Sequence, residues 1–128
     1  MRLESEAILF IMTRFENAQW QWVSSEVVLD EILQTRDEER RRRLLNLNDK
    51  ANVFLVVTDD DFKRAQELAG LGFDGMDALH LSCAEHAELD AFLTTDDRLI
   101  RRANRLAGQL KILVANPLNW LFEQRMDA

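Results

Sequence analysis

The chain has 128 residues, which is the size of one domain, and its 16 Lys and Arg against 23 Asp and Glu give a formal net charge of −7. Its 47% of apolar and 30% of charged residues exclude a disordered chain, and its single cysteine excludes an internal disulfide framework. The longest apolar run, residues 7–12, is too short to span a membrane, and the acidic balance argues against a general nucleic-acid coat.

Hydrophobic periodicity predicts helices and short strands in alternation. The predicted helices cover residues 3–18, 26–34, 37–48, 58–69, 75–88, 96–107 and 117–125. The predicted strands cover residues 20–24, 53–57, 91–95 and 111–115. The continuous apolar run over 53–57 indicates a strand that is buried on both faces. Strands separated by helices pair in parallel, so we expect one α/β domain over residues 1–128.

Three acidic residues fall where chemistry collects in such a sheet, near the carboxyl ends of strands. Asp96 follows the strand over 91–95, Asp77 lies in the first turn of the helix over 75–88, and Glu31 lies about two turns along the helix that follows the strand over 20–24. Clustered carboxylates repel one another, and hard divalent cations relieve this repulsion. The spacing is compatible with a metal-dependent phosphodiesterase site, and also with acids that only cap helix N-termini.

Taken together, these residues resemble the PIN-domain family, which includes the ribonuclease toxins of type II toxin–antitoxin pairs (virulence-associated protein C-like). The resemblance extends over residues 3–121, in the family's order and spacing. The stretches that carry it are SSEVVLDEI at 24–32, GMDALHLSCAE at 75–85, FLTTDDRLIRRA at 92–103 and ILVANPLNWL at 112–121.

The resemblance implies a three-layer α/β/α fold with a parallel sheet and a Mg²⁺- or Mn²⁺-dependent endoribonuclease that cuts single-stranded or structured RNA. By motif, the catalytic and metal-binding acids are Glu31, Asp77 and Asp96, with Asp97 as a further metal contributor. The groups that orient these carboxylates are expected to be Ser24 or Ser25, Thr94 or Thr95, and His80. The family also implies a small antitoxin partner, a homodimer and a cytoplasmic location.

The front of the chain departs from the family's pattern. PIN domains begin with a central strand that ends in a metal-binding Asp, and no residue of this sequence matches that Asp. We therefore expect an N-terminally truncated domain without its central strand, from either a misplaced start or a chain that is short by nature. The 128-residue chain is expected to show little or no Mg²⁺-dependent ribonuclease activity. The alternative function is a catalytically incomplete PIN module that acts by binding protein or RNA.

Arginines are clustered in two places, although the net charge is negative. One group shares a helical face beside Asp96 and suits either an RNA backbone or solvent: Arg98, Arg101, Arg102 and Arg105. The other is the run at 40–43, whose neighbouring acids favour a solvated face. Cys83 is predicted to be a small buried side chain. A phosphoacceptor receiver domain, suggested by VVTDDD at 56–61, is rejected because Lys111 precedes the last strand instead of following it.

Overall fold

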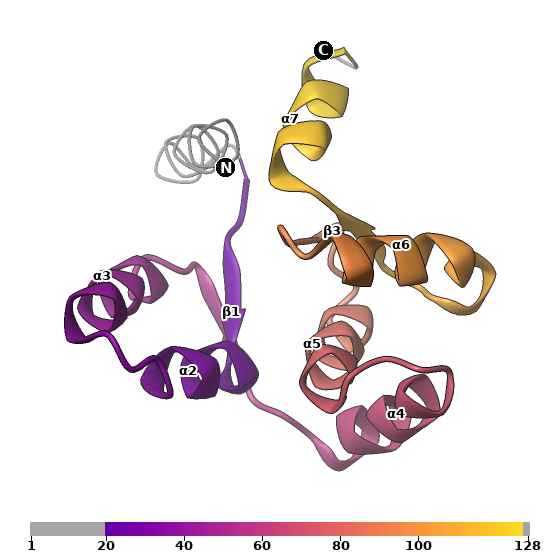
Figure 1. Cartoon of the computed structure of the whole chain (residues 1–128), viewed down its shortest axis with the longest axis horizontal. Coiled ribbons are helices and arrows are strands. Elements are labelled where there is room, and N and C mark those ends of the chain that lie inside the picture. Colours follow the sequence, from indigo (N-terminus) through magenta and orange to yellow (C-terminus); the bar gives the residue numbers. More distant parts are fainter. Residues whose placement is uncertain (1–19, 127–128) are drawn as a thin grey trace.

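The computed structural model describes residues 20–126, and the helix predicted over residues 3–18 lies outside them (Figure 1). The first half contains β1 (Val23–Ser25), α2 (Glu26–Leu33), α3 (Glu38–Asn48) and β2 (Val53–Leu55). The second half contains α4 (Asp59–Gly70), α5 (Gly75–His86), β3 (Ala91–Leu93), α6 (Asp97–Arg105), the 3₁₀ turn η1 (Ala107–Gln109), β4 (Leu113–Ala115) and α7 (Pro117–Met126). The predicted order of helices and strands is confirmed over this range, with shorter strands.

All strand pairs in the described residues are parallel, as predicted. In β1 and β2, Val23 lies opposite Val53, and in β3 and β4, Ala91 lies opposite Leu113. Each pair is joined by a helical crossover, which is the connection that parallel strands need. The described strands form two separate two-stranded sheets and not one continuous sheet, so the fold is the predicted α/β class with its sheet in two parts.

The main core lies in the second half of the chain, around α5. Leu68 of α4 and both Ala78 and Leu81 of α5 are completely buried, and α6 and β4 cover them with Leu99 and Val114. Every residue from 80 to 85 is buried, including the predicted Cys83. A helix that is buried nearly all round needs small and apolar residues on several faces, which the composition of α5 provides.

A second, smaller cluster connects the segment before β1 to α7. The rings of Trp20 and Trp120 meet edge to face, with their centroids 4.8 Å apart. Leu121 is buried beside them, and side chains of β3 and β4 pack against the same cluster. Trp20 precedes β1, and Trp120 lies in α7 after β4. Their contact therefore connects the first half of the chain to the second.

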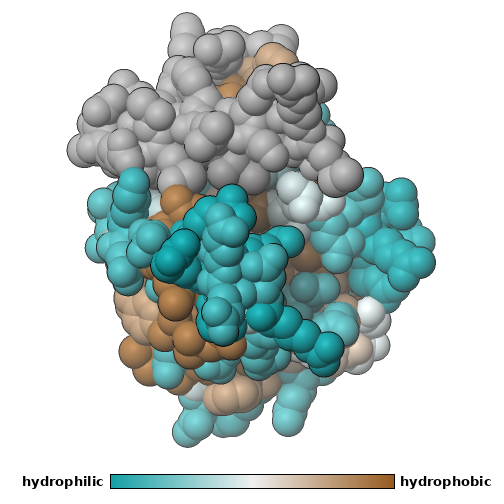
Figure 2. All heavy atoms as spheres, turned by 60° about the vertical axis from the view of Figure 1, so that its left-hand side comes forward, coloured by the Kyte–Doolittle hydropathy of each residue, from teal (hydrophilic) through white to brown (hydrophobic). Residues whose placement is uncertain are grey.

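The prediction that residues 53–57 are buried on both faces is wrong. Val53, Phe54 and Val56 are 38%, 45% and 65% exposed. In the described part of the chain, β2 pairs with β1 alone, so its other edge has no strand beside it. Figure 2, with the side that carries α2 and α3 turned forward, shows brown apolar surface beside teal polar surface. No described helix is long and apolar enough to cross a membrane.

Local capping signals are confirmed where the sequence predicted them. Thr58 and Asp61 form a reciprocal capping box at the start of α4, with Thr58 N donating to Asp61 Oδ2 over 2.9 Å. Asn116 Oδ1 accepts from Leu118 N over 2.8 Å, directly before Pro117 opens α7. These bonds satisfy backbone donors that a helix start otherwise leaves without partners.

Candidate active site

Asp96 is held at the junction between β3 and α6. Its Oδ1 caps α6 by accepting from the backbone N–H groups of Arg98, at 3.0 Å, and Leu99, at 3.2 Å. Its own N–H donates to Thr94 Oγ1 over 3.1 Å, and Thr94 in turn donates its N–H to Ala115 O of β4 over 3.0 Å. Both capping bonds are accepted by Oδ1, so the cap does not use the second carboxylate oxygen.

Asp77 lies one turn into α5, where it is partly buried near other carboxylates. Burial raises its pKa above the ordinary value, and the negative charges of Asp74, Asp96 and Glu31 raise it further, while His80 opposes them. These interactions come from residues on different elements. The fold therefore brings the three predicted acids, Glu31, Asp77 and Asp96, within electrostatic reach of one another.

Glu31 reaches this region from α2 by contacting His80 of α5. The distance from its Oε1 to His80 Nε2 is 2.5 Å. The His80 ring is buried and lies beside Phe92 of β3, with ring centroids 5.5 Å apart. His80 thus contacts the exposed Glu31 carboxylate, and its orienting role stays a prediction.

The predicted serines bond elsewhere. Ser25 Oγ caps α2 by accepting from Val28 N over 3.2 Å, and the Ser24 hydroxyl donates to Asn48 Oδ1. Among the described residues, neither serine bonds to a site carboxylate. Asp97 and Thr95 are exposed beside Asp96.

The four arginines predicted on one face of α6 differ in their exposure and contacts. Arg98, Arg101 and Arg105 are exposed on the helix, whose opposite face is buried through Leu99 and Ala103. Arg102 is partly buried and donates from Nη1 to Gly72 O. Gly72 has a φ of +106°, a conformation that suits glycine, and a Cβ there would collide with the Arg102 guanidinium. Arg102 therefore holds the turn after α4.

The donor set suits a hard divalent cation. Carboxylate oxygens are the ligands that Mg²⁺ and Mn²⁺ prefer, and repulsion between the three acids is what a cation relieves. Within the described residues, no three His, Cys, Asp or Glu side chains are already close enough to hold a metal. Gathering these carboxylates around an ion therefore requires side-chain movement.

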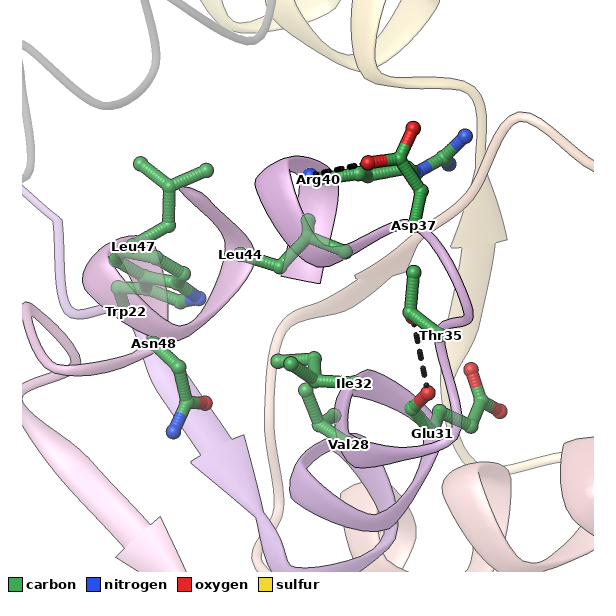
Figure 3. A pocket seen from close by; sticks show the side chains of 10 residues that line it. All are labelled: Trp22, Val28, Glu31, Ile32, Thr35, Asp37, Arg40, Leu44, Leu47 and Asn48. Carbon is green, nitrogen blue, oxygen red and sulfur yellow. Dashed lines mark hydrogen bonds between the residues drawn. The ribbon is translucent and has the colours of Figure 1, made fainter. Parts of the chain in front are cut away.

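A pocket of about 500 Å³ lies next to this site, between α2 and α3. Trp22 and Leu47 form one end of it, and Arg40 and Asp37 lie at the other (Figure 3). Glu31 contributes to the wall, and its carboxylate points away from Trp22.

Asp74 was not among the predicted site residues. It is the N-cap of α5, where Oδ1 accepts from Met76 N over 3.0 Å, and its charge acts on Asp77. The sequence does carry a local indication of Asp74, because this acid lies three residues before Asp77 at the start of the same helix. No local signal predicts the contact between Glu31 and His80, which are far apart in the sequence.

In a comparison with protein-family models, the PIN domain model matches residues 6–105. Searches of curated proteins and of solved structures found no significant match. The matched region holds all three candidate acids, Glu31, Asp77 and Asp96, and extends over most of the chain.

Proposed function

This chain belongs to the PIN domain family, and on that premise we propose that it is a divalent-metal-dependent endoribonuclease that cuts RNA at Glu31, Asp77 and Asp96. The family indicates a nuclease-type function, its members generally depend on divalent metals, and its nucleases bind RNA. The observation that carries the proposal is the PIN domain match over residues 6–105, which holds all three acids, and the charges of Asp96 and Glu31 act on Asp77 in the fold. Carboxylates held together against their repulsion are suited to a cation.

Each side chain has a distinct part in this proposal. Asp77 and Asp96, with Glu31, would hold Mg²⁺ or Mn²⁺, and Asp97 would contribute through water. The ion, when bound, supplies a water of lowered pKa and charge stabilisation for the leaving oxygen. Thr94 anchors the backbone of Asp96, and His80 orients Glu31.

The exposed arginines of α6 would bind the RNA backbone. Arg98, Arg101 and Arg105 follow directly from the helix start at Asp96, so phosphates bound to them lead toward the carboxylates. Such contacts make RNA affinity dependent on salt. Of the four arginines predicted to bind RNA, Arg102 is the least suited, because its guanidinium already donates a hydrogen bond to Gly72 O.

The direct test measures metal binding and RNA cleavage by the same protein. Mn²⁺ binding is followed by calorimetry, and cleavage of a labelled single-stranded RNA is followed with Mn²⁺ and with EDTA. We expect weak Mn²⁺ binding and slow, EDTA-sensitive cleavage, because no three His, Cys, Asp or Glu side chains of the described residues are already close enough to hold a metal. Asp77→Asn and Asp96→Asn should abolish both.

The matched control is Asp90→Asn, which removes the same charge from an exposed residue between α5 and β3. It should leave Mn²⁺ binding and cleavage unchanged. Cleavage that persists in EDTA, or in both Asp77→Asn and Asp96→Asn, would exclude these carboxylates as the nuclease site.

The alternative function is a PIN module that binds RNA or protein without cutting. The spacing of the side chains favours it, because no three His, Cys, Asp or Glu side chains of the described residues are close enough to hold a metal. RNA binding without Mn²⁺ binding or cleavage would decide for this alternative.

We further propose that the protein is a cytoplasmic toxin of a type II toxin–antitoxin pair, inhibited by a small antitoxin, and that it forms a homodimer. The motif resemblance supports the toxin role, and the exposed Val53, Phe54 and Val56 offer an apolar surface for a protein partner. Induced expression should arrest growth, and co-expression of a small gene from directly upstream should restore it. Growth that is unaffected by expression of an active nuclease would contradict the toxin role.

A further inference from the structure

We propose that the pocket between α2 and α3 binds one nucleobase of the RNA, with Arg40 at its rim holding a neighbouring phosphate. This inference rests on the proposed RNA substrate and adds a subsite beside the candidate carboxylates. It gives a role to the basic helix α3, which neither the predicted site nor the core accounts for.

The volume and lining of the pocket suit a mostly apolar group. Its volume of about 500 Å³ lies within the range of small-molecule sites. The walls are Val28 and Ile32 of α2 and Leu44 and Leu47 of α3, and the indole of Trp22 lies at one end (Figure 3). Proteins that bind single-stranded RNA place unstacked bases against such aromatic and apolar side chains.

Arg40 provides the charge that a nucleotide needs at the mouth of this pocket. It is exposed, and among the described residues its guanidinium has no hydrogen-bond or ion-pair partner. Arg41 Nη1 donates to Thr35 O over 2.9 Å and Arg43 lies 3.9 Å from Glu39, whereas Arg42 is exposed and lies outside the pocket lining. An unpaired arginine beside an apolar pocket is complementary to a phosphate attached to a buried base.

The direction of the side chains connects this pocket to the carboxylates. In Figure 3, Arg40 and Glu31 extend to the same side, away from Trp22. A base near Trp22 would therefore have its phosphate near Arg40 and its next linkage on the side of Glu31. The excess of arginine over glutamate in α3 (EERRRRLLNLN) favours a negatively charged occupant.

The test uses a fluorescent 2′-O-methyl RNA of about ten nucleotides, which resists cleavage, and the full chain in EDTA. Affinity is measured by anisotropy for the wild type, for Arg40→Ala and for Leu44→Trp, which fills the pocket. The matched controls on the same helix are Arg42→Ala and Asn46→Trp, which alter exposed residues outside the lining. A second probe of the same length carries abasic sites in place of its bases.

We expect Arg40→Ala and Leu44→Trp each to weaken binding by about fivefold or more, and both controls to stay near the wild type. The wild type should bind the base-bearing RNA better than the abasic probe by a similar factor, and Leu44→Trp should not distinguish them. Circular dichroism confirms that Leu44→Trp is folded, and the exposed Arg40→Ala tests the proposal independently.

Equal losses in Arg40→Ala and Arg42→Ala, or equal wild-type affinity for both probes, would overturn the base subsite. If Leu44→Trp binds RNA as tightly as the wild type does, the base subsite is also overturned. A protein partner would then be the expected occupant of the pocket. Because these measurements need no metal, failure of Mn²⁺ binding by the carboxylates is a separate result that concerns the proposed nuclease function.

Discussion

At the scale of single residues, the carboxylate of Asp77 is the most informative group. Its pKa is raised by burial and by the like charges of Asp74, Asp96 and Glu31. A folded-state pKa above the unfolded value means that ionisation of Asp77 opposes folding, so stability falls as the pH rises through this pKa.

Asp77→Asn is therefore expected to stabilise the apo protein at pH 7, by up to about 1 kcal/mol. Urea unfolding at pH 7 and at lower pH measures the free energy of unfolding. The gain should shrink as the pH falls through the pKa of Asp77, because the wild-type carboxyl group then becomes neutral. A gain that is independent of pH would show that charge repulsion is not its cause.

His80 is the residue whose removal tests the orientation of Glu31. Under the proposed function, His80→Ala should lower Mn²⁺ affinity about 10- to 100-fold, because a carboxylate that loses its partner is no longer directed toward the site. His80→Gln, which keeps an N–H donor, should lose less. Calorimetric titration with Mn²⁺ measures the effect.

The matched control is His86→Ala on the same helix. His86 Nδ1 contacts Asp61 Oδ1 at 3.0 Å, away from the three carboxylates, so its loss should not change Mn²⁺ affinity. Tighter Mn²⁺ binding by His80→Ala would mean that His80 competes with the ion for Glu31.

At the scale of elements, the pair of Arg64 and Glu85 joins α4, α5 and the segment before β4. Arg64 Nε lies 2.7 Å from Glu85 Oε1, and Glu85 Oε2 accepts from Lys111 N over 2.8 Å. Burial raises the pKa of Glu85, but the bonds from Arg64 and Lys111 outweigh burial and lower it below its usual value. This stabilisation is present above the unfolded pKa and is lost as the pH falls through the folded pKa.

Glu85→Gln should destabilise the protein by about 1–3 kcal/mol at pH 7, because a buried charged bond is replaced by a neutral one. The control is Glu67→Gln, which removes the exposed partner of the same arginine and should cost less than about 1 kcal/mol. Urea unfolding at pH 7 and at acidic pH measures both. The cost of Glu85→Gln should decrease in acid, and a constant cost would assign it to packing.

The C-terminus of α5 carries a local strain that glycine would remove. Glu88 has a φ of 56°, and it follows a helix end at which Leu89 N donates to Ala84 O over 3.1 Å and Glu88 N to Glu85 O over 3.0 Å. This is the Schellman arrangement, whose left-handed residue is usually glycine.

Glu88→Gly is expected to raise the free energy of unfolding by about 0.5–1 kcal/mol, since the left-handed conformation costs a residue with a Cβ more than it costs glycine. Thermal or urea unfolding measures the change. Gln66→Gly, at an exposed position inside α4, should instead destabilise by about 1 kcal/mol. A loss of stability in Glu88→Gly would mean that the Glu88 side chain contributes more than its strain costs.

At the scale of the whole molecule, the candidate acids lie on three separate helical segments. Glu31 belongs to α2, Asp77 to α5, and Asp96 caps α6. An ion bound by all three would connect the half of the chain that carries β1 and β2 to the half that carries β3 and β4.

Mn²⁺ is therefore expected to raise the melting temperature of the wild type. At about ten times its Kd, it should add about 1.4 kcal/mol to the free energy of unfolding. EDTA should reverse the shift, and Asp77→Asn should show none. The effect is measured as the change in melting temperature when Ca²⁺ or Mn²⁺ is added. An equal change in Asp77→Asn would mean that the ion binds at another site.

The sequence by itself determined the order of helices and strands, the caps at Thr58 and Asn116, and the motif residues that identify the family. These features depend on neighbours within one helical turn or on residue types in a fixed order. Only the tertiary structure decided that the described strands form two pairs and that Val53, Phe54 and Val56 are exposed. It alone also brought His80 to Glu31. Burial and pairing depend on which distant segments cover a strand or helix, and an apolar run has the same local pattern whether or not a layer covers it.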